Sequence, residues 1–211
     1  MTLDHSDLIN SIMSSLDRLE YIKAAEIPNI DLYMDQVTTF MEERLKNTTR
    51  NPGIDKVLTK TMINNYVKNN VMPAPNKKKY SKEHMYILIV IYYFKNVLSI
   101  NDIDVALNPI REKYCGDSKD FKLEDVYEGI RTTAEKLTES IKDDLLDTYR
   151  VASDIFPEAK EDDKETLTMF SFITLLVLDV YIKKLLIEKI IDGCSENAVP
   201  GKDRDRNKNK D

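Results

Sequence analysis

Apolar residues recur along most of the chain three or four positions apart, which is the spacing of amphipathic α-helices. The first such pattern covers residues 7–23 and stops before Pro28. The second follows Asp31, which can cap a helix, and its apolar side consists of Val37, Phe40, Met41 and Leu45. Residues 47–53 (NTTRNPG) are rich in turn formers, so a loop is expected there.

A third, short helix is predicted from Thr59 to Asn69. Thr59 can accept a hydrogen bond from the free N–H groups of a first helical turn. Asn70 tolerates the left-handed conformation that often follows a helix, so it is expected to end this one. Residues 71–80 are expected to be extended, because prolines at positions 73 and 75 do not fit a helix interior.

Two further helices are predicted after this extended segment. Ser81 caps the first, which is apolar on nearly all sides, as a central core helix would be; its apolar residues are Met85, Leu88, Ile89, Ile91, Tyr92 and Leu98. Ser99 and Asp102 have the spacing of a capping box and open the second helix, which Pro109 is expected to end.

The last third of the chain predicts two long helices. From Leu123 to Phe156 apolar or small residues alternate in steps of four and three, which favours a helix packed against a partner helix. Residues 166–191 are apolar on most faces, so this helix needs cover from the rest of the fold or from a second copy. Residues 193–211 alternate in charge and are expected to be a disordered tail. Together these patterns predict an all-α fold class.

Charge is distributed unevenly over the 211 residues. The formal net charge is −6, but residues 55–95 carry eight lysines and two carboxylates, which makes this segment +6 and the remainder −12. Salt screens interactions beyond roughly 8–10 Å, so a polyanion responds to this local charge rather than to the whole chain. A basic segment in an acidic protein favours a nucleic-acid partner.

The predicted helix 59–69 carries side chains of the types that contact DNA. Lys60, Asn64 and Lys68 are four residues apart and share one face. Asparagine can make a bidentate contact to adenine, and lysine binds phosphates. A lysine run alone is usually a solvated loop, but here it follows a polar helix and a proline turn. The predicted DNA-binding residues are Thr59, Lys60, Thr61, Asn64, Asn65, Tyr66, Lys68, Lys77, Lys78, Lys79 and Tyr80.

The order TKTMINNYVKNNVMP, a basic run, KKYSKEH, an apolar helix and LSINDI resembles the winged helix-turn-helix of the MerR family. By this resemblance Thr59 takes the cap position of the recognition helix and Tyr66 the place of a tyrosine of the family motif. Lys79 and Tyr80 match the end of a basic wing, and Asn64 stands where that family has a phosphate-binding arginine. The resemblance implies a small two-stranded wing.

Residues 30–190 also resemble an uncharacterised domain family of low-GC Gram-positive bacteria, on the motifs YMDQV, INNYVK and KKYSKEH. A presumed regulatory role is what this resemblance implies. The expected organisation is an N-terminal helix and linker (1–29), a MerR-like winged helix-turn-helix domain (30–110), a helical dimerisation or effector domain (120–192) and the tail (193–211).

The function expected from these features is that of a cytoplasmic, DNA-binding transcriptional regulator. It is expected to form a homodimer through its C-terminal helices, although the two long helices could instead pack on each other within one chain. A small-molecule effector pocket could be lined by Tyr127, Met169, Phe170 and Phe172, but aromatic residues at helical spacing more often belong to a core. The alternative function is a helical protein-interaction module without DNA binding.

Other classes of function have little support in the sequence. Residues 1–10 do not have the features of a secretory signal, and the most apolar run, residues 167–178, is shorter than the roughly 20 residues that span a membrane. Two histidines, at positions 5 and 84, and two separated cysteines form no catalytic or metal-binding motif. An enzyme, a metal and a cofactor are therefore not expected.

Overall fold

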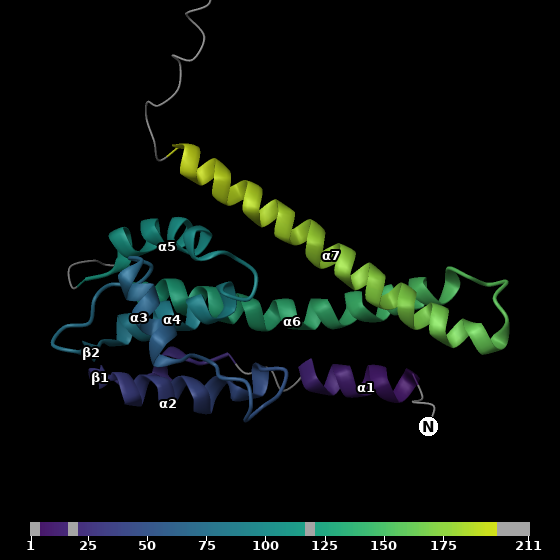
Figure 1. Cartoon of the computed structure of the whole chain (residues 1–211), viewed down its shortest axis with the longest axis horizontal. Coiled ribbons are helices and arrows are strands. Elements are labelled where there is room, and N and C mark those ends of the chain that lie inside the picture. Colours follow the sequence, from purple (N-terminus) through teal and green to yellow (C-terminus); the bar gives the residue numbers. More distant parts are fainter. Residues whose placement is uncertain (1–4, 17–20, 117–120, 198–211) are drawn as a thin grey trace, which may run out of the picture.

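The computed structural model describes residues 5–16, 21–116 and 121–197. The fold class is mainly α, as the sequence predicts: helices account for nearly all of the regular structure in these ranges, and a small sheet has two strands (Figure 1). The helices are α1 (His5–Leu16), α2 (Met34–Leu45), α3 (Lys60–Lys68), α4 (Lys82–Phe94), α5 (Ile100–Tyr114), α6 (Leu123–Asp154) and α7 (Glu161–Asn197). Two short 3₁₀ helices, η1 (Ala24–Glu26) and η2 (Lys46–Thr48), precede and follow α2.

The main hydrophobic core is built around α4. Seven of its thirteen residues are buried, which agrees with the prediction of a helix that is apolar on nearly all sides. On α2 the predicted apolar face is confirmed, because Val37, Met41 and Leu45 are fully buried and Phe40 packs against them from the edge. The first turns of α6 also belong to this core through Leu123 and Tyr127.

The sheet pairs β1 (Leu32–Tyr33) with β2 (Lys79–Tyr80) in antiparallel orientation, with Leu32 opposite Tyr80. Only one strand of this sheet, β2, lies in the predicted wing, and its partner β1 comes from before α2. For the same reason the prediction that Asp31 caps this helix is wrong. Tyr33 is the residue before α2, and its backbone N–H donates to the side chain of Gln36 at 2.9 Å.

The ends of α1 and α5 differ from the predictions. The described part of α1 ends at Leu16, and Tyr21–Lys23, which were predicted to be helical, are not. Pro109 lies inside α5, which continues to Tyr114, because the last turns of this helix pack on the main core through Ile110 and Tyr114. Tertiary contacts thus outweigh the usual effect of a proline.

The last helix is longer than predicted at both ends. It begins at Glu161, where backbone N–H groups of the first turn donate to the carbonyl of Lys160, and it includes residues 193–197 of the predicted tail. The rest of that tail, residues 198–211, lies outside the described residues. The predicted helix 123–156 is confirmed as α6, which ends two residues earlier.

A second, smaller core lies where α1, α6 and α7 meet. Ile9, Ala152 and Phe172 are buried there, and the rings of Tyr149 and Phe172 meet edge to face with centroids 5.3 Å apart. The start of α7 thus packs on α6 as an intrachain hairpin. Farther along, α7 diverges from α6 and runs back over α5 (Figure 1).

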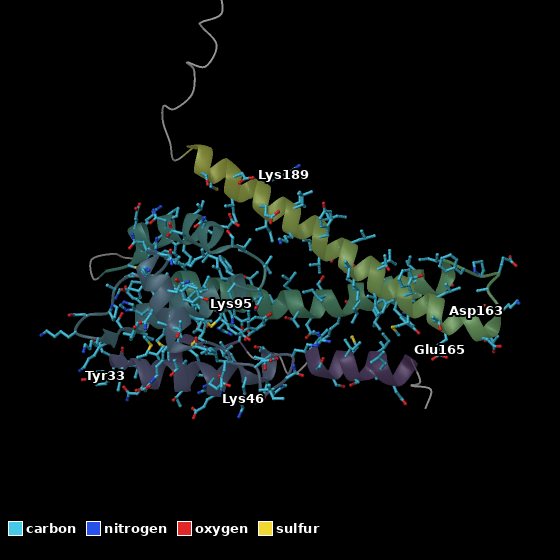
Figure 2. The ribbon with its side chains drawn as sticks, viewed as in Figure 1. Tyr33, Lys46, Lys95, Asp163, Glu165 and Lys189 are labelled. Carbon is cyan, nitrogen blue, oxygen red and sulfur yellow. The ribbon has the colours of Figure 1, made fainter. Side chains whose placement is uncertain are left out.

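The part of α7 that diverges from α6 exposes apolar side chains to solvent. In Figure 2, Asp163 and Glu165 lie at the end of α7 that is close to α6, whereas Lys189 lies on the distant part. Eleven large apolar side chains of α7 are at least 38% exposed: Phe170, Ile173, Val177, Leu178, Val180, Tyr181, Ile182, Leu185, Leu186, Ile187 and Ile190. No helix in the described ranges combines the length and apolar character needed to cross a membrane.

Candidate nucleic-acid interface

The short helix α3 has well-defined signals at both ends. The hydroxyl of Thr59 accepts a hydrogen bond from the backbone N–H of Met62 at 3.2 Å, which caps the first turn. At the other end Asn70 has a φ of 57°, and the N–H of Val71 donates to the carbonyl of Tyr66 at 2.9 Å. This is the hydrogen-bond pattern of a Schellman motif. The predicted cap and the left-handed residue are both confirmed.

The two sides of α3 differ sharply in exposure. Ile63 and Tyr66 are buried in the main core, whereas Lys60, Thr61, Asn64, Asn65 and Lys68 are exposed. Tyr66 is only 6% exposed and Tyr80 3%, and burial raises the pKa of both hydroxyls. The structure therefore places these two predicted DNA-contacting tyrosines in the core, because each lies on the inner side of its element.

Several lysines of the basic segment are engaged by groups of the same chain. Lys82 pairs with Glu124 at 3.0 Å, Lys56 reaches Glu42 at 4.0 Å, and Lys95 donates to the carbonyl of Val57 at 2.8 Å. These three lysines lie outside the predicted DNA-binding set, and their ammonium groups contact other parts of the same chain.

The predicted DNA-binding lysines fall into two groups. Lys60 pairs with Asp35 on α2, and the ammonium of Lys79 lies 5.2 Å from the centre of the Tyr33 ring. Lys68, Lys77 and Lys78 have no ion pair or hydrogen bond to any described side chain. Three ammonium groups thus remain available to an anionic partner.

Lys77 and Lys78 form the tip of a tight turn. The N–H of Lys79 donates to the carbonyl of Asn76 at 2.9 Å, so the two lysines are the central residues of the turn. Their φ angles are 49° and 64°, in the left-handed region that glycine and asparagine normally occupy. Lysine in this conformation costs roughly 1–2 kcal/mol per residue. Such a cost is typical of positions kept for a function.

The asparagines of α3 are not equivalent. The side-chain amide of Asn69 donates to the side-chain oxygen of Asn65 at 2.9 Å and to its backbone carbonyl at 2.8 Å. Asn64 is exposed and makes no side-chain hydrogen bond within the described part of the chain. Asn64, rather than Asn65, therefore has a side-chain amide with both its oxygen and its nitrogen available to a base edge.

His84 anchors the wing to the start of α4. The backbone N–H of Ser81 donates to its Nδ1 at 3.1 Å, and its ring meets that of Tyr80 edge to face at 5.6 Å. Burial lowers the pKa of His84, against the opposing influence of the backbone at Ala74 and the carboxylate of Glu83. The neutral imidazole is therefore the form that the fold favours.

The exposed face of α3 and the strands lie at one end of the molecule, opposite the turn between α6 and α7 (Figure 1). At this end, cationic side chains can bind phosphates while the short polar side chains of α3 reach a groove. Within the described ranges no three His, Cys, Asp or Glu residues are grouped to hold a metal ion.

The four residues predicted to line an effector pocket do not come together. Tyr127 belongs to the main core, whereas Met169 and Phe172 belong to the second core and Phe170 is 67% exposed. Sequence reasoning also missed Arg111, whose guanidinium donates to the backbone carbonyl of Asn70 at the end of α3. No local pattern signals a contact between positions so far apart.

Comparison with known families matches residues 22–130, about half of the chain, to a family described as a domain of unknown function, DUF1836. The chain belongs to this family. No curated protein and no solved structure gives a significant match. The DUF1836 region coincides with the main core, which runs from Ile22 to Tyr127. The candidate interface thus lies wholly within the part shared with the DUF1836 family.

Proposed function

We propose that this DUF1836 protein is a cytoplasmic transcriptional regulator that binds double-stranded DNA through a MerR-like winged helix-turn-helix. The observation that carries the proposal is the turn of Lys77 and Lys78, two lysines held at positive φ without a partner among the described residues. A turn selected only for folding would have Asn or Gly here. Two strained, unpaired cations are better explained by phosphate contacts.

The exposed side of α3 supplies groups for the second part of the proposal. Thr61, Asn64 and Lys68 project from a helix whose opposite side is fixed in the core. In this arrangement Lys68 and the turn lysines hold phosphates, and Asn64 and Thr61 contact base edges. Lys60 joins them when a phosphate displaces Asp35, its present partner.

The connection between α2 and α3, residues 46–59, is longer than the three- or four-residue turn of an ordinary helix-turn-helix. Binding to DNA therefore depends on α3 and the lysine turn rather than on the fixed angle between α2 and α3 that a short turn would impose. The acidic remainder of the chain, at −12, limits non-specific binding by other surfaces and orients the basic end toward DNA.

A second copy of the chain is the proposed partner of α7. Eleven large apolar side chains of α7 are exposed in the single chain, and large exposed apolar patches mark interfaces. A two-fold dimer fits the proposed function, because paired recognition helices bind the two halves of a palindromic site. In such a dimer the diverging half of α7 is covered by its symmetry mate.

The experiment that tests DNA binding compares a fluorescent duplex from the chain's own upstream region with a scrambled duplex, from low to physiological salt. Preference for the upstream duplex, with log affinity falling at about −0.9 per neutralised phosphate on a log-salt scale, is the expected result. Replacing Lys77 and Lys78 together with alanine should weaken binding to both duplexes and flatten the salt dependence. The matched control, K160A/K164A, removes the same charge from the opposite end of the molecule and should change neither.

The same titration decides between the two functions. Absence of binding to either duplex at low salt would contradict the proposal and favour the alternative, a helical protein-interaction module that has the fold without DNA binding. If the protein bound both duplexes equally and K77A/K78A still weakened this binding, the protein would bind DNA without preferring the upstream sequence.

A further inference from the structure

The apolar side of α6 is covered at its two ends but exposed in the middle. Leu123 belongs to the main core and Ala152 to the second core. Between them Ile130, Leu137 and Ile141 continue in steps of seven and four residues, which keeps their side chains on one side of the helix. These three side chains are 63%, 58% and 45% exposed. The middle of α6 therefore presents apolar side chains that the described part of the chain leaves largely uncovered.

A stretch of α7 is uncovered in the same way. The helix is buried near its start at Phe172 and near its end at Ile191, and it contacts α5. Of residues 177–187, which lie between these two positions, ten are exposed, although eight of the eleven are apolar. A helix that is apolar on most sides is normally buried. Residues 177–187 therefore need a partner surface that is itself apolar.

The two uncovered segments match in length. Residues 130–141 of α6 and 177–187 of α7 each make about three helical turns, roughly 16–18 Å at 1.5 Å per residue. Within one chain they do not cover each other, because α7 diverges from α6 beyond the second core (Figure 1). In a two-fold dimer each segment of one copy can meet the other segment of its partner, because the symmetry repeats every contact in reverse.

A pocket of about 350 Å³ continues the uncovered part of α6 toward the main core. Ile130 and Ala134 line it on α6, and most of its other walls are apolar side chains of α4 and α5, together with Tyr21. The pocket is larger than the voids that normally remain in a packed protein interior. A helix lying along α6 can fill it with several aliphatic side chains.

Net charge indicates which helix of a second copy fits residues 177–187 of α7. This segment carries two lysines and one aspartate, a net charge of +1. The helix α6 carries nine carboxylates and four basic side chains, a net charge of −5. A second α7 segment would bring like charges together, whereas α6 offers the opposite sign. Charge complementarity of this kind suppresses wrong partners and fixes the register of the right one.

We propose that residues 177–187 of α7 dock on residues 130–141 of α6 in a second copy of the chain, with apolar side chains entering the pocket, and that the exchange is reciprocal. The two copies of α6 and α7 then form a four-helix bundle with an apolar interior. This assignment rests on the dimer of the proposed function, for which it names the surface that α7 meets. It does not depend on DNA binding.

The first test introduces charge on the α6 side of the contact. L137E/I141E places two carboxylates at positions that are exposed in the single chain but buried in the proposed dimer. Size-exclusion chromatography with light scattering should give a dimer for the natural protein and a monomer for this variant, with the dimer Kd raised about a hundredfold or more, because unpaired buried carboxylates are unfavourable. The matched control, Lys136→Glu, changes the net charge equally at an exposed position on another side of α6 and should remain dimeric.

Mixing two monomeric variants tests the reciprocal exchange itself. V177E/V180E alters only α7 and L137E/I141E alters only α6, so a homodimer of either variant lacks both contacts. In an equimolar mixture one contact joins an unaltered α7 to an unaltered α6. A heterodimer should therefore form at concentrations at which the natural protein is fully dimeric.

A dimeric L137E/I141E would overturn the proposal, because α7 would then dock elsewhere, and so would a mixture that forms no heterodimer. If L137E/I141E does not fold, as judged by circular dichroism, Leu137→Glu alone decides. A monomeric natural protein would overturn both this exchange and the dimer of the proposed function. DNA binding is measured separately in the duplex titration, so its failure and the failure of the exchange are distinguishable.

Discussion

The guanidinium of Arg111 on α5 donates a hydrogen bond to the backbone carbonyl of Asn70, the residue after the C-cap of α3. Asn70 is left-handed, with a φ of 57°, and this conformation directs the chain from the helix into the wing. Arg111 is itself held by Asp104 at 2.7 Å, so the contact joins two well-fixed groups. The end of the candidate recognition helix therefore depends on α5 for its position.

The left-handed conformation of Asn70 predicts opposite effects for two small substitutions. Asn70→Ala should lower the free energy of unfolding by about 1 kcal/mol, because a Cβ without a compensating polar group disfavours this conformation. Asn70→Gly should leave stability unchanged or raise it slightly. Urea unfolding of the two variants measures the difference, and the carbonyl that binds Arg111 is present in both. Equal stabilities would contradict the role of φ at this position.

The turn at Lys77 and Lys78 predicts that stability and DNA binding change in opposite directions. The double substitution K77N/K78G supplies the residues that this turn favours. It should raise the free energy of unfolding by about 1–2 kcal/mol, since the strain of two left-handed lysines is relieved. Affinity for DNA should fall, and the salt slope should drop by about 0.9 for each phosphate that the variant no longer neutralises.

K77A/K78A is the matched comparison for this prediction, since it removes the same charge without relieving the strain. Denaturation and fluorescence titration of both variants separate the two effects. If K77N/K78G were more stable and bound DNA as tightly as the natural protein, the two lysines would have no part in DNA binding and the main support for the proposed function would fall.

Features encoded over a few residues could be predicted from the sequence, and those made by distant contacts could not. Both ends of α3 follow from Thr59 and Asn70, which act on neighbouring N–H and carbonyl groups. In contrast, α5 continues past Pro109 because residues of its last turns pack on the main core. The strand β1 has only two residues, which is too short for any periodic pattern.

The candidate site also combines features that the local sequence encodes with features that depend on distant contacts. Exposed lysines and asparagines on one face of α3 follow from helical spacing, whereas the engagement of Lys60 by Asp35 depends on how α2 and α3 pack. Outside this site, a pocket lined mainly by α4, α5 and α6 had no signal in the sequence, because its shape depends on how these helices pack together. Aromatic residues near the start of α7 suggested a pocket there, but Phe172 packs into the second core instead.

The buried imidazole of His84 predicts a pH-dependent stability. Because burial lowers its pKa from 6.5, the unfolded chain takes up a proton at a higher pH than the native protein does. Stability is therefore complete above about pH 6.5 and falls as the pH is lowered through the native pKa. His84→Gln can still accept the hydrogen bond from Ser81, as glutamine does in capping boxes, but cannot titrate. Its unfolding midpoint should change less between pH 7 and pH 5 than that of the natural protein.

Asp31 and Glu83 raise the pKa of His84 and so work against this dependence. Asp31→Asn should for this reason make the loss of stability on acidification slightly larger. An equal pH response of the natural protein and His84→Gln would show that His84 is not the group responsible.

The exposed apolar side chains of α7 predict that the protein is a dimer whose interface can be broken by two charges. Val177 and Val180 are 60% and 62% exposed in the single chain, so replacing both with glutamate does not disturb the core within a chain. In a dimer the same positions are buried, and unpaired carboxylates there are strongly unfavourable. Size-exclusion chromatography with light scattering should therefore give a dimer for the natural protein and a monomer for V177E/V180E. The control, Lys164→Glu, adds negative charge at an exposed polar position of the same helix and should remain dimeric.

Point substitutions test this interface better than removal of the C-terminal helices, because truncation near Ile110 would also take Leu123 and Tyr127 out of the main core. If V177E/V180E stayed dimeric, the copies would associate through another surface. If the natural protein were a monomer, it could not contact both halves of a palindromic site at once. DNA binding would then have to come from one copy of α3 and its lysine turn. Loss of DNA affinity in V177E/V180E, with α3 and the turn unchanged, would in turn show that both copies are needed at the site.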